Sequence, residues 1–256
     1  MGSVGLVAAA AVVGVTVGGS SSSSMPSGDL PGWRQGFAED FDVDAPLGSF
    51  PGSAYGDRWT GYEGLPDTSG AGRYSNERVV SVHDGVLDMH LRTEDGVPLV
   101  AAPTPLVGGS WGGQTYGRYS VRFRADAAEG YKTAWLLWPD SDKWADGEID
   151  FPEGPLDGSM YAANLCVGHA GTFCYKSDDL ATFTAWHVAT IEWTPDAVTF
   201  YLDGKKVGSS DSSPRKPMHW ILQTETDHGR PPASSSGHVE VDWVTVYERV
   251  PSSSDE

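Results

Sequence analysis

The chain has 256 residues, enough for one large β domain, and its 32 glycines, 10 tryptophans and 10 tyrosines favour strands and turns over helices. Asp and Glu number 35 against 17 Lys and Arg, which gives a net charge of −18. Such a charge disfavours nucleic acid, anionic membranes and sulfated or uronic polymers as partners, so we expect a neutral one.

The first 19 residues predict a secretory leader. Residues 4–17 are an uncharged apolar run, too short to span a bilayer and similar in length to a signal-peptide core, although no basic residue precedes Arg34. A buried strand is the alternative for this run. The serine tract 20–24 opens a predicted Ser/Gly/Pro linker over residues 20–35. We therefore expect a secreted protein with one globular domain over residues 36–250 and a polar tail over residues 251–256.

After the linker, alternating apolar and polar residues predict strands. The first covers residues 37–42. Residues 46–73 are rich in Gly, Pro and aromatic residues without a clear period, so they either form the rim of a cleft or pack over the end of a sheet. Residues 79–94 alternate on both sides of Asp84-Gly85, a dipeptide typical of hairpin turns. Residues 114–124 predict another strand with one apolar face.

The continuous apolar run 133–138 predicts a strand buried between two sheets. Trp135 and Trp138 lie on opposite faces of this strand, so we expect one of them in the core and assign Trp138 to a cleft. Trp144 follows in a segment of turn residues. An indole there suits the C–H face of a sugar ring, whereas core packing is the alternative for any single tryptophan.

The densest group of acids lies in residues 143–154, KWADGEIDFPEG. In a strand, Glu148 and Asp150 share one face, while the apolar residues between and after them point into a core. Strict alternation would send Glu153 inward, where an unpaired carboxylate is costly to bury. One extra residue, a β-bulge, returns Glu153 to the acid face, and Pro152 suits a bulge because it lacks an N–H. The prediction is three carboxyls on one solvated face.

This row of acids has the groups that glycoside cleavage needs. Neighbouring carboxylates raise one another's pKa, and cleavage uses one ionised and one protonated carboxyl. We therefore interpret Glu148 as the nucleophile, Glu153 as the acid/base and Asp150 as the hydrogen-bond partner that tunes Glu148. An acidic surface strand, a calcium site and a lectin surface are the alternatives that the spacing leaves open.

Cys166 and Cys174 are the two cysteines of the chain. In an exported protein they can pair across a short loop as a structural disulfide. Residues 183–193 and 198–202 predict two strands, followed by a second hairpin turn at Asp203-Gly204. His187 lies among strand residues, and we interpret it as structural.

The strand predicted near residues 217–225 carries two polar residues, Gln223 and Glu225, on one face. If this face lines the cleft, both side chains are placed to bind sugar hydroxyls. The last predicted strand, residues 239–247, contains Asp242.

The E-x-D-x-x-E pattern of Glu148, Asp150 and Glu153 resembles the bulged signature of glycoside hydrolase family 16, in its laminarinase and agarase-like branch. The resemblance covers roughly residues 36–248, because segments 114–126, 186–204, 217–225 and 239–248 also resemble family strands in the family's order. It implies an all-β, two-sheet antiparallel sandwich of the concanavalin-like jelly-roll type, with an open concave cleft. It also implies the same three catalytic roles and retention of anomeric configuration.

The resemblance implies no cofactor for catalysis. It does imply a structural calcium held by Asp242, the carbonyl of Gly85 and one of Glu39 or Asp40, and oxygen ligands of this kind suit calcium.

The sequence thus predicts a monomeric, endo-acting, retaining hydrolase of a neutral β-linked polysaccharide, in particular a β-1,3- or β-1,3-1,4-glucan. Retention implies that the carboxyls of Glu148 and Glu153 lie ~5 to 5.5 Å apart. A galactan hydrolase of agar type, with the same three acids, and a non-catalytic lectin-like module are the alternatives.

Overall fold

The computed structural model describes residues 24–251 of the chain. The predicted leader, most of the serine tract and residues 252–256 lie outside these described residues. Within the described range, no helix has the length and hydropathy needed to cross a membrane. The first strand begins at Trp33, within the stretch predicted as a linker.

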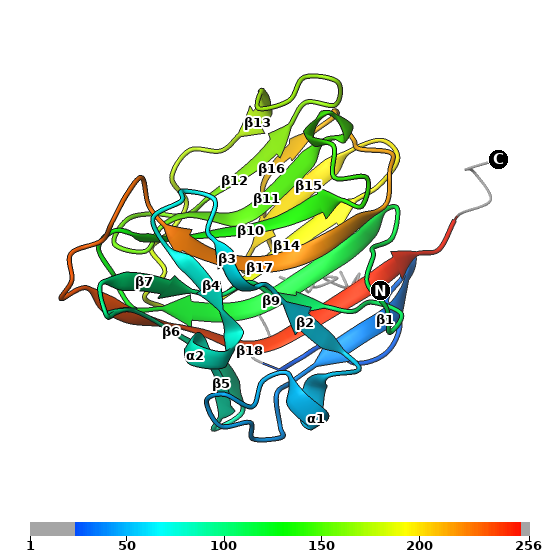
Figure 1. The fold of residues 1–256 in the computed structure, drawn as a ribbon. Helices are drawn as coiled ribbons and strands as arrows, with labels where there is room; N and C mark the ends of the chain where they lie inside the picture. Colours follow the sequence, from blue (N-terminus) through cyan, green and yellow to red (C-terminus); the bar gives the residue numbers. More distant parts are fainter. Residues whose placement is uncertain (1–23, 252–256) are drawn as a thin grey trace, which may run out of the picture.

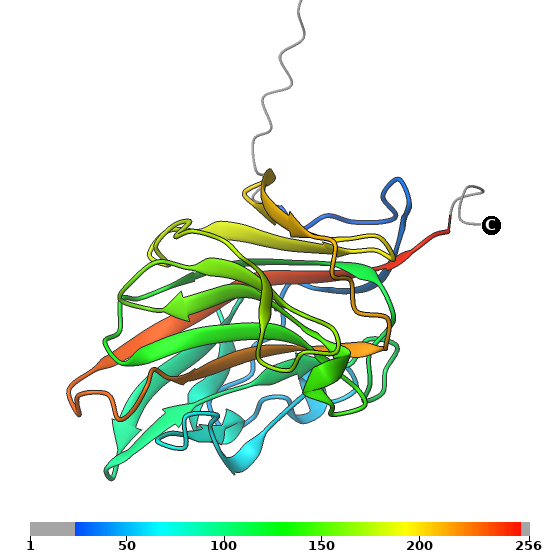
Figure 2. The same ribbon diagram turned by 90° about the horizontal axis from the view of Figure 1, so that it is seen from above.

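Two sheets stack face to face and form the body of the molecule (Figures 1 and 2). In the described residues the larger sheet has 11 strands in the order β16-β15-β14-β9-β18-β6-β7-β4-β3, with β1 also pairing with β18 and β5 with β6. These strands are β1 (Trp33–Glu39), β3 (Glu63–Pro66), β4 (Arg73–Ser75), β5 (Val80–His83), β6 (Val86–Glu94), β7 (Val97–Val100), β9 (Gly117–Ala125), β14 (His187–Trp193), β15 (Val198–Leu202), β16 (Lys205–Ser210) and β18 (Ser236–Arg249).

The smaller sheet has five described strands in the order β13-β12-β11-β10-β17. They are β10 (Tyr131–Pro139), β11 (Glu148–Pro155), β12 (Tyr161–Leu165), β13 (Phe173–Lys176) and β17 (Met218–Thr226). The remaining elements are a two-stranded ribbon and three short helices, namely β2 (Trp59–Gly61), β8 (Pro103–Pro105), α1 (Gly52–Tyr55), α2 (Asn76–Val79) and the 3-10 helix η1 (Trp144–Asp146). Strand pairing is antiparallel except between β4 and β7. The predicted all-β, two-sheet sandwich is therefore confirmed.

Aromatic side chains fill the space between the two sheets. Trp135 of β10 is fully buried and meets Phe123 of β9 edge to face, with ring centroids 5.1 Å apart. Phe151 of β11 meets Phe200 of β15 in the same way at 5.7 Å. Both contacts join a strand of the smaller sheet to one of the larger, so they fix which face of β10 and β11 turns inward.

Two hairpins of the larger sheet follow the predicted turn chemistry. Asp84 and Gly85 join β5 to β6, and both have positive φ, at 53° and 74°. Asp203 and Gly204 join β15 to β16 with φ of 51° and 76°. Positive φ at both central residues is what a type I′ turn requires, and its twist matches that of the flanking strands.

The aperiodic segment 46–73 serves both of the roles considered for it. Tyr55 and Trp59 are buried among the aromatic residues of the core. Tyr62 and Leu65, further along the same segment, line the cavity described below. Figure 1 shows β3 and β4 crossing in front of β17, so this part of the chain forms a wall opposite the smaller sheet.

Candidate active site

A bulge in β11 turns three acids toward the same side of the smaller sheet. Asp150 pairs with Leu136 of β10 and Glu153 with Ala134, so two residues of β11 lie opposite one residue of β10. The register with β12 shifts at the same place, between Asp150 and Glu153. The bulge contains Pro152, whose peptide bond to Phe151 is cis. The predicted bulge is therefore present, and it brings Glu153 to the face of its two predecessors.

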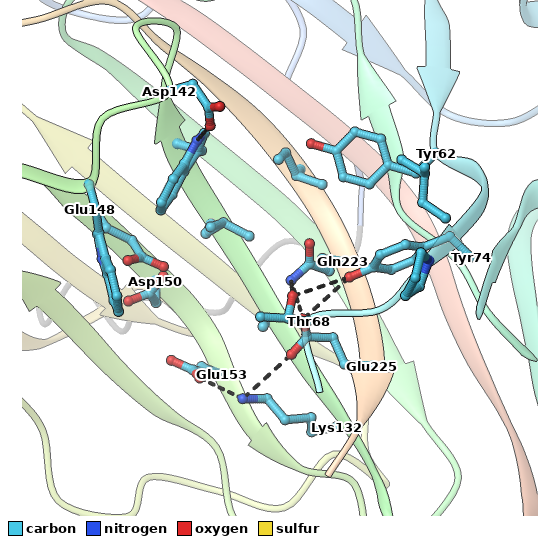
Figure 3. A pocket seen from close by; sticks show the side chains of 17 residues that line it. Tyr62, Thr68, Tyr74, Lys132, Asp142, Glu148, Asp150, Glu153, Gln223 and Glu225 are labelled. Atoms are coloured by element: carbon cyan, nitrogen blue, oxygen red, sulfur yellow. Dashed lines mark hydrogen bonds and ion pairs between the residues drawn. The ribbon is translucent and has the colours of Figure 1, made fainter. Parts of the chain in front are cut away.

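The three acids line one cavity of about 470 Å³ (Figure 3). Glu148 and Asp150 lie on one side of it, Tyr62 and Tyr74 lie on the opposite side, and Gln223 and Glu225 lie between them (Figure 3). The other lining residues are Leu65, Pro66, Thr68, Lys132, Ala134, Leu136, Trp138, Asp142, Trp144, Glu153 and Ile221. All four predicted sugar-binding residues, Trp138, Trp144, Gln223 and Glu225, are thus in the same cavity as the acids.

The face that carries the acids is less exposed than the sequence suggested. Asp150 is only 3% exposed, because its neighbours on β10 and β12 flank it. Burial is the main reason why the pKa of Asp150 lies well above its usual value, and the charges of Glu148 and Glu153 raise it further. The prediction of three carboxyls on one solvated face is wrong for Asp150, whose burial disfavours its charged form.

Glu148 is the more ionisable member of the pair. Burial raises its pKa to about 7, while hydrogen bonds from Asp150 and Trp144 act in the opposite direction. Its Oε2 atom is buried and has no hydrogen-bond partner among the described residues. A proton on Asp150 lets that residue donate to Glu148, which favours the carboxylate form of Glu148. Their hydrogen bond therefore lowers the pKa of Glu148 and raises that of Asp150.

Glu153 lies in a different polar environment. Its Oε1 accepts a hydrogen bond from Lys132 Nζ at 2.8 Å, and the same Nζ lies 3.8 Å from Oε2 of Glu225. Glu225 in turn accepts hydrogen bonds from Gln223 Nε2 at 2.6 Å and from the hydroxyl of Tyr74 at 3.3 Å. Gln223 and Glu225 are thus bonded to protein groups, and their predicted contact with sugar stays a prediction.

Trp138 and Trp144 form an aromatic wall near Glu148. Their ring centroids lie 6.5 Å apart, and the Trp138 indole donates to Oδ1 of Asp142 at 3.0 Å. Trp144 is 46% exposed, although the loop around Gly171 packs against its ring. Trp135 is in the core, as expected for one of the two tryptophans of β10.

Cys166 and Cys174 form a disulfide, as predicted, and close the loop that contains Gly171. His187 also behaves as predicted, since its Nδ1 lies 2.8 Å from Oδ2 of Asp203 at the hairpin turn.

Two of the residues proposed for calcium form ion pairs with arginines. Glu39 forms an ion pair with Arg58 at 2.9 Å, and Asp242 forms one with Arg122 at 2.5 Å. In residues 24–251, no group of three or more Asp, Glu, His or Cys side chains is arranged to hold a metal. Gly85 lies in its hairpin turn, and the calcium site stays a prediction.

Sequence reasoning missed the cavity residues Lys132, Tyr74 and Asp142, and it placed Tyr62 and Thr68 only within a segment that was one of two candidates for a cleft rim. Lys132 had a signal, because it lies two residues before Ala134 and so shares the cavity face of β10 with Trp138. The buried strand was predicted over residues 133–138 only, so Lys132 lay outside the predicted strand. The tyrosines had no local signal, because their position depends on the path of the aperiodic segment.

Several known proteins resemble this chain. A segment of 134 residues is 28% identical to Crh-like protein 2 of Aspergillus fumigatus and covers 49% of this chain and 29% of that protein. A segment of 104 residues is 26% identical to a β-glucanase of Fibrobacter succinogenes and covers 38% of this chain and 30% of that protein. The matches therefore span less than a third of the length of these relatives.

Solved structures extend the likeness to the whole fold. SCLam, a non-specific endo-β-1,3(4)-glucanase, matches with a TM-score of 0.69 at 20% identity over 88% of this chain and 98% of that one. The model of the glycosyl hydrolases family 16 matches residues 104–245, a segment that includes the bulged strand, β10 and β17. This match covers more than half of the 256 residues, and the chain therefore belongs to the glycosyl hydrolases family 16.

Proposed function

We propose that the protein is an endo-acting, retaining glycoside hydrolase that cleaves a neutral β-glucan with β-1,3 or mixed β-1,3-1,4 linkages. The observation that carries this proposal is the bulge of β11, which brings Glu148, Asp150 and Glu153 to one cavity. Family membership supports the reaction class, and the likeness to SCLam, a non-specific endo-β-1,3(4)-glucanase, and to the β-glucanase of Fibrobacter succinogenes supports a β-glucan as the substrate class.

The proposed reaction has two displacements. In the first, the carboxylate of Glu148 attacks the anomeric carbon while Glu153 gives its proton to the glycosidic oxygen, so the bond to the leaving sugar breaks and a glycosyl-enzyme ester forms. In the second, Glu153 takes a proton from water, the resulting hydroxide attacks the same carbon, and Glu148 leaves as a carboxylate. Asp150 stays protonated and donates its hydrogen bond to Glu148, since its burial disfavours a charge there.

The lining of the cavity supports a neutral sugar chain. Five acids, Asp142, Glu148, Asp150, Glu153 and Glu225, line it against a single lysine, so a polymer with its own negative charges would be repelled. Trp144 and Trp138 offer apolar faces on which the C–H side of a pyranose ring can stack. We propose these two rings as the sugar platforms.

We also propose that the protein acts outside the cytoplasm. The Cys166–Cys174 disulfide supports this, because structural disulfides persist in oxidising compartments.

Release of reducing ends tests the function. Wild type and Glu148→Gln are incubated with laminarin, lichenan, agarose and carrageenan, and we expect release from the two glucans by wild type alone. Proton NMR of the first product, recorded before mutarotation, should show the β-anomer, since the configuration is retained. Activity confined to agarose or carrageenan would show that the substrate is a galactan and not a glucan. If wild type binds a polymer but releases no more reducing ends than Glu148→Gln does, the protein is a lectin-like module.

A further inference from the structure

Lys132 is the one Lys or Arg among the described residues that line the cavity. Its ammonium group is largely buried, with 19% of the side chain exposed, and it lies between two carboxylates on different strands. Glu153 of β11 accepts its hydrogen bond at 2.8 Å, and Glu225 of β17 is 3.8 Å away. Burial lowers the pKa of Lys132, but the two acids outweigh this and raise it overall, so the cation persists at neutral pH.

Glu225 is held independently of Glu153. It accepts hydrogen bonds from Gln223 and Tyr74, and it lies at 5% exposure between β10 and the wall formed by β4. It therefore gives Lys132 a second counter-charge that stays in place when Glu153 binds a proton. A buried lysine that had only Glu153 as its partner would resist protonation of that acid more strongly.

Other groups around Glu153 act against its charge. Asp150 and Glu148 lie on its own strand, Asp227 follows β17, and all three carry or can carry negative charge. Tyr161 of β12 differs from these acids, because its hydroxyl is hydrogen-bonded to Glu153, and its pKa is raised by burial and by that neighbour. Lys132 is the cation in hydrogen-bond contact with Glu153 among the described residues, and the Tyr161 hydroxyl is a neutral partner of the same carboxyl.

We propose that Lys132 is the positioning residue of Glu153, whose carboxylate it orients and pairs with, and that Glu225 acts through Lys132 instead of binding sugar. This inference rests on the proposed function, since it concerns the step in which Glu153 passes its proton to the glycosidic oxygen. The carboxylate left on Glu153 by that transfer lies 2.8 Å from the ammonium group, so the cation stabilises the product of proton donation.

Removing the charge of Lys132 and removing that of Glu225 should move the pH profile of kcat/KM in opposite directions. General-acid catalysis needs protonated Glu153, so the alkaline limb of kcat/KM follows the pKa of that residue. Lys132→Met removes the cation, and the limb should move to higher pH by about 1 unit or more. Glu225→Gln removes the competing anion, and the limb should move to lower pH. Lys132→Arg keeps the charge and should stay near wild type.

The kinetic experiment measures pH profiles of kcat/KM on whichever polymer the wild type cleaves. Lys205→Met is the matched control, because Lys205 is an exposed lysine at the β15–β16 turn. Its profile should coincide with that of wild type. If Glu225 binds sugar instead, Glu225→Gln will raise KM and leave the alkaline limb unmoved, and this result would overturn the proposal.

A titration that needs no substrate separates this proposal from the proposed function. Protein labelled with ¹³C at the glutamate carboxyls is titrated by NMR, and Glu153→Gln identifies the Glu153 signal. Lys132→Met should raise the midpoint of that signal relative to wild type, whether or not any polymer is cleaved. Lys132→Gln repeats the test if the methionine variant does not fold. A midpoint that is the same in wild type and in the folded lysine variant would overturn the role of Lys132.

Discussion

Glu148 and Asp150 show how a single pair of side chains can lower stability in order to supply a reactive group. Both carboxyls are held in a cavity wall where burial raises their pKa values. Glu148 also has an oxygen without a hydrogen-bond partner, so the protein does not replace the hydration that this atom loses. The folded state therefore resists ionisation of a group that the proposed reaction needs as a carboxylate.

This conflict predicts a pH-dependent gain in stability for Glu148→Gln. The pKa of Glu148 is about 7 in the folded protein against 4.5 for an ordinary glutamate, so the folded state holds the proton more tightly between these values. The stability of wild type is then fully present below about pH 4.5 and falls as pH rises toward 7. The amide does not titrate. We expect Glu148→Gln to have a higher free energy of unfolding than wild type. This difference should be larger at pH 8 than at pH 4 by about 1 to 3 kcal/mol.

Thermal unfolding of both proteins at pH 4, 6 and 8 measures this difference. Glu129→Gln, which changes an exposed glutamate outside the cavity, serves as the control and should follow wild type at each pH. A Glu148→Gln advantage of the same size at all three pH values would contradict the argument.

At the scale of the element, the bulge of β11 adds one residue to an otherwise regular strand. Glu153 lies opposite Ala134 on one neighbour and Tyr161 on the other, and one residue of β11 is in excess between Asp150 and Glu153. Removing that residue would restore regular pairing on both sides. Because side chains alternate along a strand, the glutamate would then follow Asp150 at the next position on the same face.

We therefore predict that deletion of Pro152 leaves a folded protein with measurable activity, because its glutamate stays opposite Ala134. Insertion of one alanine after Pro152 should instead shift the acid out of register and lower activity about 10²-fold or more, as loss of general-acid catalysis would. Reducing-end release by both variants, compared with Glu153→Gln, measures the effect. A deletion variant that folds but is no more active than Glu153→Gln would show that the bulge does more than restore the face of the acid.

The same element shows how far sequence reasoning reaches. Local patterns predicted the bulge, the two Asp-Gly hairpins, the disulfide and the face shared by Gln223 and Glu225, because each depends on residues close together in the chain or on one strand's alternation. The burial of Asp150 was missed, since it depends on β10 and β12 together. Lys132 was missed because its partners Glu153 and Glu225 come from other strands.

At the scale of the whole molecule, the net charge of −18 adds to the five acids of the cavity. A polymer that carries carboxylates meets repulsion from the protein's field before it reaches the cavity, and dissolved salt screens this repulsion. Because this repulsion acts before the polymer is bound, we expect it to change the association of a charged polymer.

We expect a neutral β-glucan to be cleaved with a higher kcat/KM than the same glucan after partial carboxymethylation, with the largest difference at low ionic strength. The difference should narrow when sodium chloride is raised to about 0.5 M, where the screening length is only a few ångströms. Initial rates on both polymers at several salt concentrations measure it. A difference that salt does not change would point to steric exclusion of the substituent instead of charge.

The disulfide loop links the redox state of the surroundings to the exposed indole of the cavity. Cys166 and Cys174 close a short ring, and Gly171 within that ring rests against the six-membered part of the Trp144 indole. Opening the ring by a reductant would remove the backing of this indole, whereas the acids of β11 are held by their own strand neighbours. On the proposed role of Trp144 as a sugar platform, a reducing medium would therefore weaken binding of the polymer more than it would weaken the cleavage step.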